Sequence, residues 1–118
     1  MSDDDDKMKI ELTDMRPVTI SKRNWPKIAG TKDWDNQYEC QANRTWFLAV
    51  RQSKKDSRCI VYGWFTSQFQ SEETICGGTI VDSIDEVIPA IHSVCADLFP
   101  DKPSMARDCI NDLPSVEI

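Results

Sequence analysis

Few side chains in this sequence could act as catalytic nucleophiles, bases or metal ligands. His92 is the only histidine, so any Ser/His/Asp or Cys/His site would depend on it. The nearest two cysteines, Cys95 and Cys109, are 14 positions apart, whereas metal sites usually contain a tight C-x-x-C pair. We therefore expect no metal site, no cofactor and no enzymatic activity. The five cysteines, which we expect to be small buried apolar residues, are Cys40, Cys59, Cys76, Cys95 and Cys109.

Two short motifs have chemical interpretations that their surroundings do not support. The run C-G-G-T at 76–79 lacks the lysine of a phosphate-binding loop and is more typical of a bent strand. Asp33 and Asp35 flank Trp34, and paired carboxylates can hold a hard cation or exchange protons. The spacing of an EF-hand loop is absent, so we expect these carboxylates to be solvated.

Tryptophans in polar segments are the stronger candidates for a functional surface. Trp25 and Trp34 lie among lysines, arginines and aspartates, where an exposed indole would be a binding anchor. The alternative, in which each ring folds back to close the end of the core, stays open. The predicted partner-binding residues are Trp25, Trp34, Lys22, Arg23, Lys27 and Arg44.

The charges are distributed unevenly along the chain. Residues 16–58 carry ten basic and four acidic side chains, whereas residues 59–118 carry two basic and ten acidic ones. Such asymmetry indicates an interaction surface if the two halves lie on opposite sides of the molecule. If the halves interleave in space, the charges instead cancel as ordinary surface pairs.

The first residues distort the overall charge. Asp3–Lys7 spell D-D-D-D-K, the recognition sequence of enterokinase, and Met8 follows as an expected native start. Residues 1–7 are therefore interpreted as an expression-tag remnant, and residues 8–118 as a single domain. Their removal changes the net charge from −6 to −3, because 13 basic residues then face 16 acidic ones.

The elements that would position these side chains predict an α+β fold. Alternating apolar residues indicate strands, and the stripe Ile84, Val87, Ile91, Val94, Leu98 indicates an amphipathic helix, with Ser83 and Glu86 as a capping box. Pro89 would either kink this helix or delay its start towards Glu86, and Ser104 would cap a last one. We expect an antiparallel three- to four-stranded meander covered by the C-terminal amphipathic helix, in two layers. The expected segments are strands at 17–21, 44–52, 58–67 and 74–81, a helical turn at 21–30, a loop at 31–43, and helices to 98 and over 104–113.

One further feature is the stretch N-W-P-K-I-A-G-T-K-D-W-D-N-Q-Y-E-C-Q-A-N-R-T-W-F-L-A-V-R-Q, which is followed by C-I-V-Y-G-W. This part of the chain resembles a group of small uncharacterised bacterial proteins carried on mobile elements. The resemblance covers roughly residues 17–64. It implies an accessory role in a bacterial cytoplasm and transfers no functional residue. A leader is not expected either, since charged residues follow Met8 where an apolar core would be needed.

These observations together predict a non-enzymatic accessory or regulatory protein that binds a macromolecular partner, for which we expect another protein. The alternative is a nucleic-acid-binding module that uses the basic, Trp-containing segment 16–58. A cytoplasmic location is expected, and no apolar run approaches the length of a membrane span. Self-association into a homo-oligomer is left open.

Overall fold

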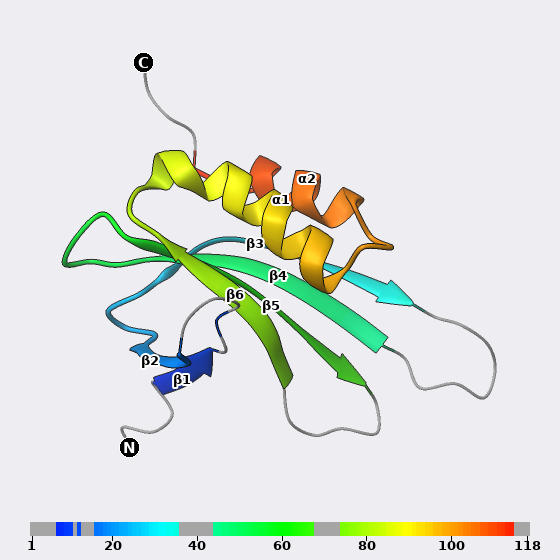
Figure 1. The fold of residues 1–118 in the computed structure, drawn as a ribbon, viewed down its shortest axis with the longest axis horizontal. Coiled ribbons are helices and arrows are strands. Elements are labelled where there is room, and N and C mark those ends of the chain that lie inside the picture. Colours follow the sequence, from blue (N-terminus) through cyan, green and yellow to red (C-terminus); the bar gives the residue numbers. More distant parts are fainter. Residues whose placement is uncertain (1–6, 11, 13–15, 36–43, 68–73, 115–118) are drawn as a thin grey trace.

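The computed structural model describes residues 7–10, 12, 16–35, 44–67 and 74–114. Within these residues six strands come first and two helices follow, with a 3-10 turn at Ile84–Glu86 between them (Figure 1). The elements are β1 (Lys7–Ile10), β2 (Val18–Ser21), β3 (Lys27–Asp35), β4 (Arg44–Gln52), β5 (Cys59–Ser67), β6 (Thr74–Val81), α1 (Val87–Leu98) and α2 (Ser104–Asn111).

The main sheet is an antiparallel meander in the order β3-β4-β5-β6, and β1 and β2 form a separate antiparallel pair. Strands β4, β5 and β6 match the expected segments within one residue, because their apolar residues alternate with period two. Phe47 pairs with Trp64 and Ala49 with Tyr62, so these four side chains share one face of the sheet. The next residues along each strand point to the other face, towards the helices.

Strand β3 corrects two expectations at once. The segment that we expected to form a helical turn to residue 30 and then a loop is extended from Lys27 to Asp35 and pairs with β4. Pro26 removes the backbone N–H that a helix would use there. A register shift between Lys27 and Ala29 breaks the period-two pattern, so the apolar alternation that marks a strand is lost. Strand β1 was also not expected and begins at Lys7, inside the proposed tag remnant.

The helices lie on one face of the sheet and enclose the larger core cluster (Figure 1). Val87, Ile91 and Val94 of α1 pack there against Leu48 and other apolar side chains of β4 and β5. The predicted meander with a helical layer over one face is thus confirmed.

Two of the predicted caps are wrong. In the predicted capping box, Ser83 makes no side-chain capping bond, and the carboxylate of Glu86 accepts from the N–H of Asp82 at 3.0 Å. At the last helix the cap position is Pro103, so Ser104 is the first residue of α2.

A second, smaller cluster lies on the opposite face, where β1 and β2 pack against the sheet (Figure 1). Ile10 and Ile20 are buried there against Ala49, Ile60 and Tyr62. Because the β1–β2 pair has only four residues in each strand, it is shorter than the nine-residue strands β4 and β5 that it lies against. The side chains of Phe47, Arg51 and Trp64, on this same face, remain partly exposed.

Two glycines allow close approaches that position these layers. A Cβ on Gly63 would lie 2.9 Å from Cε2 of Phe99, so the missing side chain lets the end of α1 approach β5. A Cβ on Gly78 would lie 2.5 Å from the Val61 carbonyl oxygen and 2.8 Å from Cβ of Tyr62. The C-G-G-T run is therefore part of a strand that passes close to Val61 and Tyr62 of its neighbour β5.

Candidate functional site

A cavity lined by lysines lies between the β1–β2 pair and the sheet face that this pair only partly covers. Its volume is about 470 Å³, and we call it the cation cavity. The cations that line it are Lys7, Lys9, Lys22, Lys27 and Arg51. No acidic side chain of the described segments lines it. The lining residues are Lys7, Met8, Lys9, Lys22, Lys27, Arg51, Tyr62 and Trp64.

Arg51 is held in a fixed orientation at the base of this cavity. Its Nε–H donates to the hydroxyl of Tyr62 at 2.9 Å, and an Nη1–H donates to the carbonyl oxygen of Trp25 at 3.0 Å. A guanidinium has five N–H donors, and three of them have no acceptor among the residues that the structure describes. Because the planar fork is already oriented, less side-chain entropy would be lost when an anion binds it.

Three aromatic rings form a stack along the same sheet face. The ring centroids of Tyr62 and Trp64 are 5.2 Å apart with 18° between their planes, and those of Trp64 and Phe47 are 4.6 Å apart with 6° between them. The indole N–H of Trp64 is buried and has no hydrogen-bond partner among the residues that the structure describes. Stacking and packing therefore hold this ring in place.

A second cavity, of about 360 Å³, adjoins the cation cavity, and we call it the aromatic cavity. Phe47, the last ring of the described stack, lies in its wall beside the cation Lys32. Lys27 and Trp64 line both cavities, so the two are neighbours on one face. The lining residues of the aromatic cavity are Lys27, Gly30, Thr31, Lys32, Phe47, Leu48 and Trp64.

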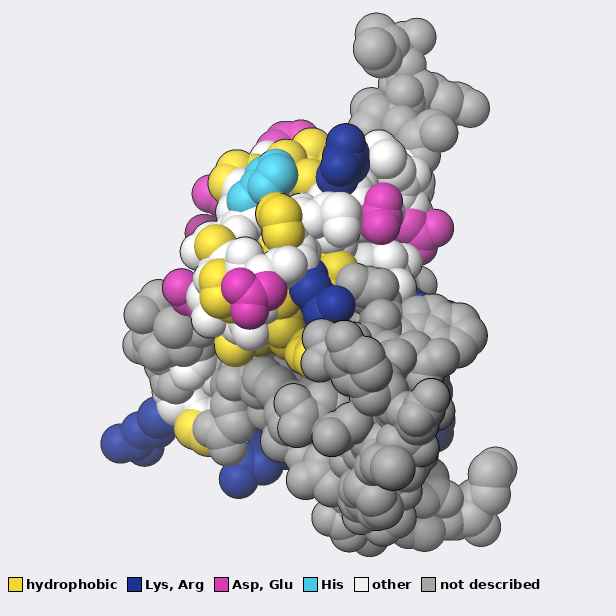
Figure 2. Space-filling model, turned by 90° about the vertical axis from the view of Figure 1, so that its right-hand side faces the viewer, with side chains coloured by type: hydrophobic (Ala, Val, Ile, Leu, Met, Phe, Trp, Pro, Cys, Tyr) yellow, Lys and Arg dark blue, Asp and Glu magenta, His cyan; other side chains and the backbone are white. Residues whose placement is uncertain are grey.

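Acidic side chains gather on the helical side of the molecule instead. Figure 2 shows the magenta carboxylates over the helices in the upper part of the view, and in its lower part the charged side chains that are visible are dark blue. Lys102 and Arg107 lie among the acidic residues of the helical layer. The two signs are thus largely separated over the described residues, because the chain from β1 to β4 carries most of the basic side chains and the helical layer carries most of the acidic ones. The exposed acidic side chains from the 3-10 turn to the end of α2 are Asp85, Glu86, Asp97, Asp101, Asp108 and Asp112.

The predicted site residues are only partly brought together. Lys22 and Lys27 both line the cation cavity, and Arg23 is exposed in the turn after β2. Trp25 packs, half buried, against the smaller core cluster, and the guanidinium of Arg58 lies 5.5 Å from its ring centroid. Trp34 and Arg44 are in β3 and β4, and their side chains lie outside the described part of the structure, as do those of Asp33 and Asp35.

Sequence reasoning missed Lys9, Lys32, Phe47, Arg51, Tyr62 and Trp64 as site residues. The signal that could have found Phe47 and Trp64 is their pairing in the predicted hairpin of 44–52 with 58–67. Opposed residues on antiparallel strands point to one face, so two large rings opposite each other indicate a cross-strand stack.

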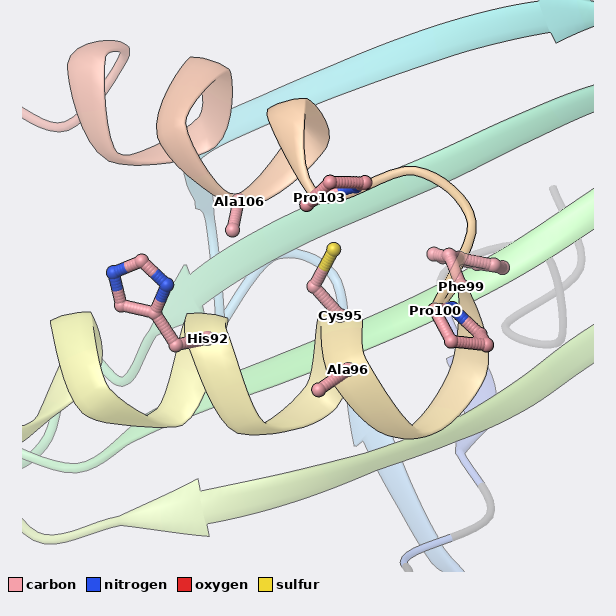
Figure 3. A pocket seen from close by; sticks show the side chains of 7 residues that line it. All are labelled: His92, Cys95, Ala96, Phe99, Pro100, Pro103 and Ala106. Atoms are coloured by element: carbon pink, nitrogen blue, oxygen red, sulfur yellow. The ribbon is translucent and has the colours of Figure 1, made fainter.

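A third hollow lies in the helical layer, between α1 and α2, and has a volume of about 360 Å³. Its lining is largely apolar, and Figure 3 shows the side chains of His92 and Cys95 from α1 facing Ala106 of α2 and Pro103, which precedes α2. Ile88, also on α1, is the exposed large hydrophobic residue of the described chain, at 45% exposure. An apolar side chain of a partner could fill this hollow.

The chemistry available at this hollow is limited. The Sγ of Cys95 donates to the carbonyl oxygen of Lys102 at 3.3 Å, and burial raises the pKa of its thiol. A raised pKa disfavours the thiolate, which is the reactive form of cysteine. Within the described residues, no group of three His, Cys, Asp or Glu side chains is arranged as metal ligands would be.

Comparison of the chain with protein-family models, with curated proteins and with solved structures gives no match. No helix in the part of the chain that the structure describes has the length and apolar content needed to cross a membrane.

Proposed function

We propose that this protein is a non-enzymatic accessory protein that binds single-stranded nucleic acid on the open face of its sheet. The observation that carries the proposal is the coincidence of cations and stacked rings in two adjoining cavities. Lys9, Lys22 and Arg51 surround one of them, and Phe47 and Trp64 line the other.

The two kinds of side chain match the two parts of a nucleotide. Lysine and arginine neutralise backbone phosphates, and this contact is independent of sequence. Aromatic rings stack with exposed bases, which supplies about 1–3 kcal/mol for each base. A duplex hides the faces of its bases, so the stack favours a single strand. Most acidic side chains of the helical layer would repel a polyanion from that side of the molecule. Of the described acidic side chains in this layer, Asp112 reaches the edge of the sheet, where its carboxylate accepts from the Gly30 N–H at 2.9 Å.

A protein partner, which the sequence favoured, is the second candidate. It would use the apolar hollow between α1 and α2 together with the exposed Ile88. The acidic side chains that surround this layer would favour a basic partner segment. We place this candidate second because its surface offers one hollow, whereas the sheet face combines two cavities with oriented donors.

The proposal is compatible with the bacterial, mobile-element setting that the resemblance implies, and with a cytoplasmic location. Cys59, Cys95 and Cys109 are free and buried, which suits a reducing compartment.

Fluorescence anisotropy of a labelled oligothymidylate, titrated with the protein between about 50 and 200 mM salt, tests the proposal. We expect binding that weakens as salt rises, and weaker binding of a duplex of equal length. The double variant Lys9→Gln/Lys22→Gln should lower the salt slope by about 0.7 for each phosphate that is no longer neutralised. Its control, Lys55→Gln/Arg107→Gln, removes the same charge from exposed positions outside both cavities. Absence of binding at low salt, or equal effects of the two double variants, would contradict the proposal.

A further inference from the structure

Lys27 occupies the boundary between the two cavities, since it lines both. Gly30 explains how a lysine can lie there. A Cβ built on Gly30 would be 2.6 Å from Cε of Lys27 and 3.0 Å from its Nζ. The lysine side chain therefore lies across β3, over the position where any other residue would place its side chain.

This arrangement places one ammonium group between two different environments. On one side the cation cavity contains Lys9, Lys22 and the oriented Arg51. On the other side the aromatic cavity contains Phe47 and Lys32. An anion at Lys27 would thus have a cationic pocket on one side and an aromatic wall on the other. The Asp112 carboxylate also reaches this strand, but it accepts from the backbone N–H of Gly30 at 2.9 Å and forms no ion pair with Lys27 within the described residues.

Building on the proposed function, we propose that the two cavities bind two consecutive nucleotides, and that the Lys27 ammonium binds the phosphate joining them. One base stacks on Phe47 at the end of the three-ring stack, and the 5′ phosphate of the dinucleotide lies among Lys9, Lys22 and Arg51. Lys27 then binds the linking phosphate, which a mononucleotide does not have. The smallest ligand that uses the whole surface is a dinucleotide with a 5′ phosphate.

Two variants separate the position of this ammonium from its charge. Lys27→Gln removes the charge and keeps most of the side chain. Gly30→Ala keeps every charge and every ring, but its methyl group forces Cε and Nζ of Lys27 away from the boundary. The displaced atoms are the far end of a flexible side chain, and the nearest backbone atom, the Leu48 carbonyl oxygen, is 3.3 Å away. Arg107→Gln, on α2, is the charge-matched control.

Isothermal titration with thymidine monophosphate, 5′-phosphorylated dithymidylate and an oligothymidylate of about six nucleotides tests the inference. For the unmodified protein we expect the dinucleotide to bind about tenfold more tightly than the mononucleotide, as one charged hydrogen-bonded contact supplies. Lys27→Gln and Gly30→Ala should both remove most of that preference, while Arg107→Gln preserves it. Circular dichroism melting establishes that each variant is folded. If Gly30→Ala does not fold, the loss of the dinucleotide preference in Lys27→Gln tests the inference by itself.

The outcomes distinguish this inference from the proposed function. If the oligonucleotide binds but the preference for the dinucleotide is absent, or survives Lys27→Gln, the inference is wrong and the proposed function stands. If none of the three ligands binds at low salt, the proposed function fails and the inference fails with it.

Discussion

The guanidinium of Arg51 and the hydroxyl of Tyr62 are joined across β4 and β5 by a hydrogen bond of 2.9 Å. This bond connects the two features that define the sheet face, because Tyr62 is also the first ring of the stack with Trp64 and Phe47. Tyr62 itself is almost fully buried, at 1% exposure. The cation is thus oriented by a side chain that belongs to the core.

Replacing Tyr62 by phenylalanine tests the value of this orientation. The ring and its stacking remain, while Nε of Arg51 loses its acceptor and the guanidinium is left with the Trp25 carbonyl. We expect the affinity for an oligonucleotide to fall roughly fivefold, which corresponds to about 1 kcal/mol, and the melting temperature to change little. Anisotropy titrations measure the affinity. Arg51→Lys keeps the charge but not the planar fork and should lose a similar amount, so an unchanged affinity in both variants would contradict this role.

Truncation of Trp25 distinguishes packing from docking. Its indole packs, half buried, against the smaller core cluster below the guanidinium of Arg58. We expect Trp25→Ala to lower the free energy of unfolding by about 2 kcal/mol, less than for a fully buried tryptophan. Urea unfolding measures this, with Lys22→Ala in the neighbouring turn as an exposed control. If Trp25→Ala abolished binding without loss of stability, the indole would be the exposed anchor that the sequence suggested.

A methyl group on Gly63 should separate the helical layer from the sheet. It would meet Cε2 of Phe99 at 2.9 Å and Cδ1 of Leu98 at 3.0 Å. Phe99 belongs to the larger core cluster, and Leu98 packs against that cluster while partly exposed. We expect Gly63→Ala to destabilise the fold by about 1–3 kcal/mol, as overpacking does. Gly30→Ala is a matched control, since its methyl group displaces mainly the flexible end of Lys27. Equal unfolding midpoints for the two variants would show that the close approach of α1 has no energetic consequence.

The raised pKa of the Cys109 thiol leads us to expect that the protein loses stability in alkaline solution. Burial, and secondarily the charge of Asp112, raise its pKa from 9.0 to about 12. Above pH 9.0 the unfolded chain releases this proton and the folded chain does not, so ionisation favours unfolding. Stability from this group is complete below pH 9.0 and is lost as the pH rises towards about 12, by about 1.4 kcal/mol per pH unit.

The variant Cys109→Ala isolates this contribution from the other groups that titrate at high pH. Its free energy of unfolding should decrease less steeply with pH than that of the unmodified protein, so that the difference between the two proteins changes above pH 9.0. Urea titrations at a series of pH values measure that difference. A difference that stays constant with pH would show that the thiol ionises equally in both states.

The sequence predicted the fold where one physical signal dominates. Period-two alternation located β4, β5 and β6 within one residue, and the apolar stripe of Val87, Ile91 and Val94 located α1. Strand β3 was missed because it is an edge strand with a register shift at Lys27, so partners elsewhere in the sheet, and not its own residues, make it extended. Of the pair β1–β2 only the second strand was predicted, for the same reason: the burial of the pair depends on Ala49, Ile60 and Tyr62 of the main sheet.

The candidate site was less predictable than the fold. Basic residues and tryptophans were identified by type, and Lys22 and Lys27 indeed line one cavity. The register of strand pairing, however, decides which rings share a face, and a shift of one residue would move every side chain of a strand to the other face. Trp25 and Trp64 both pack, half buried, against the smaller core cluster, but of these two Trp64 is the one that lines the cavities. The position of Lys27 over Gly30 depends on a register shift that no local pattern shows.

Amide proton–nitrogen correlation spectra, recorded while the protein is titrated with a short oligothymidylate at low salt, test the central claim most directly. We expect the largest shift changes at residues of the two cavities, above all Lys27, Gly30, Phe47, Arg51 and Trp64, with the indole N–H of Trp64 among them. Residues of α1 and α2 should remain unaffected. Shift changes confined to α1 and α2 around Ile88, or no changes at all, would contradict the claim that the open sheet face binds the nucleic acid.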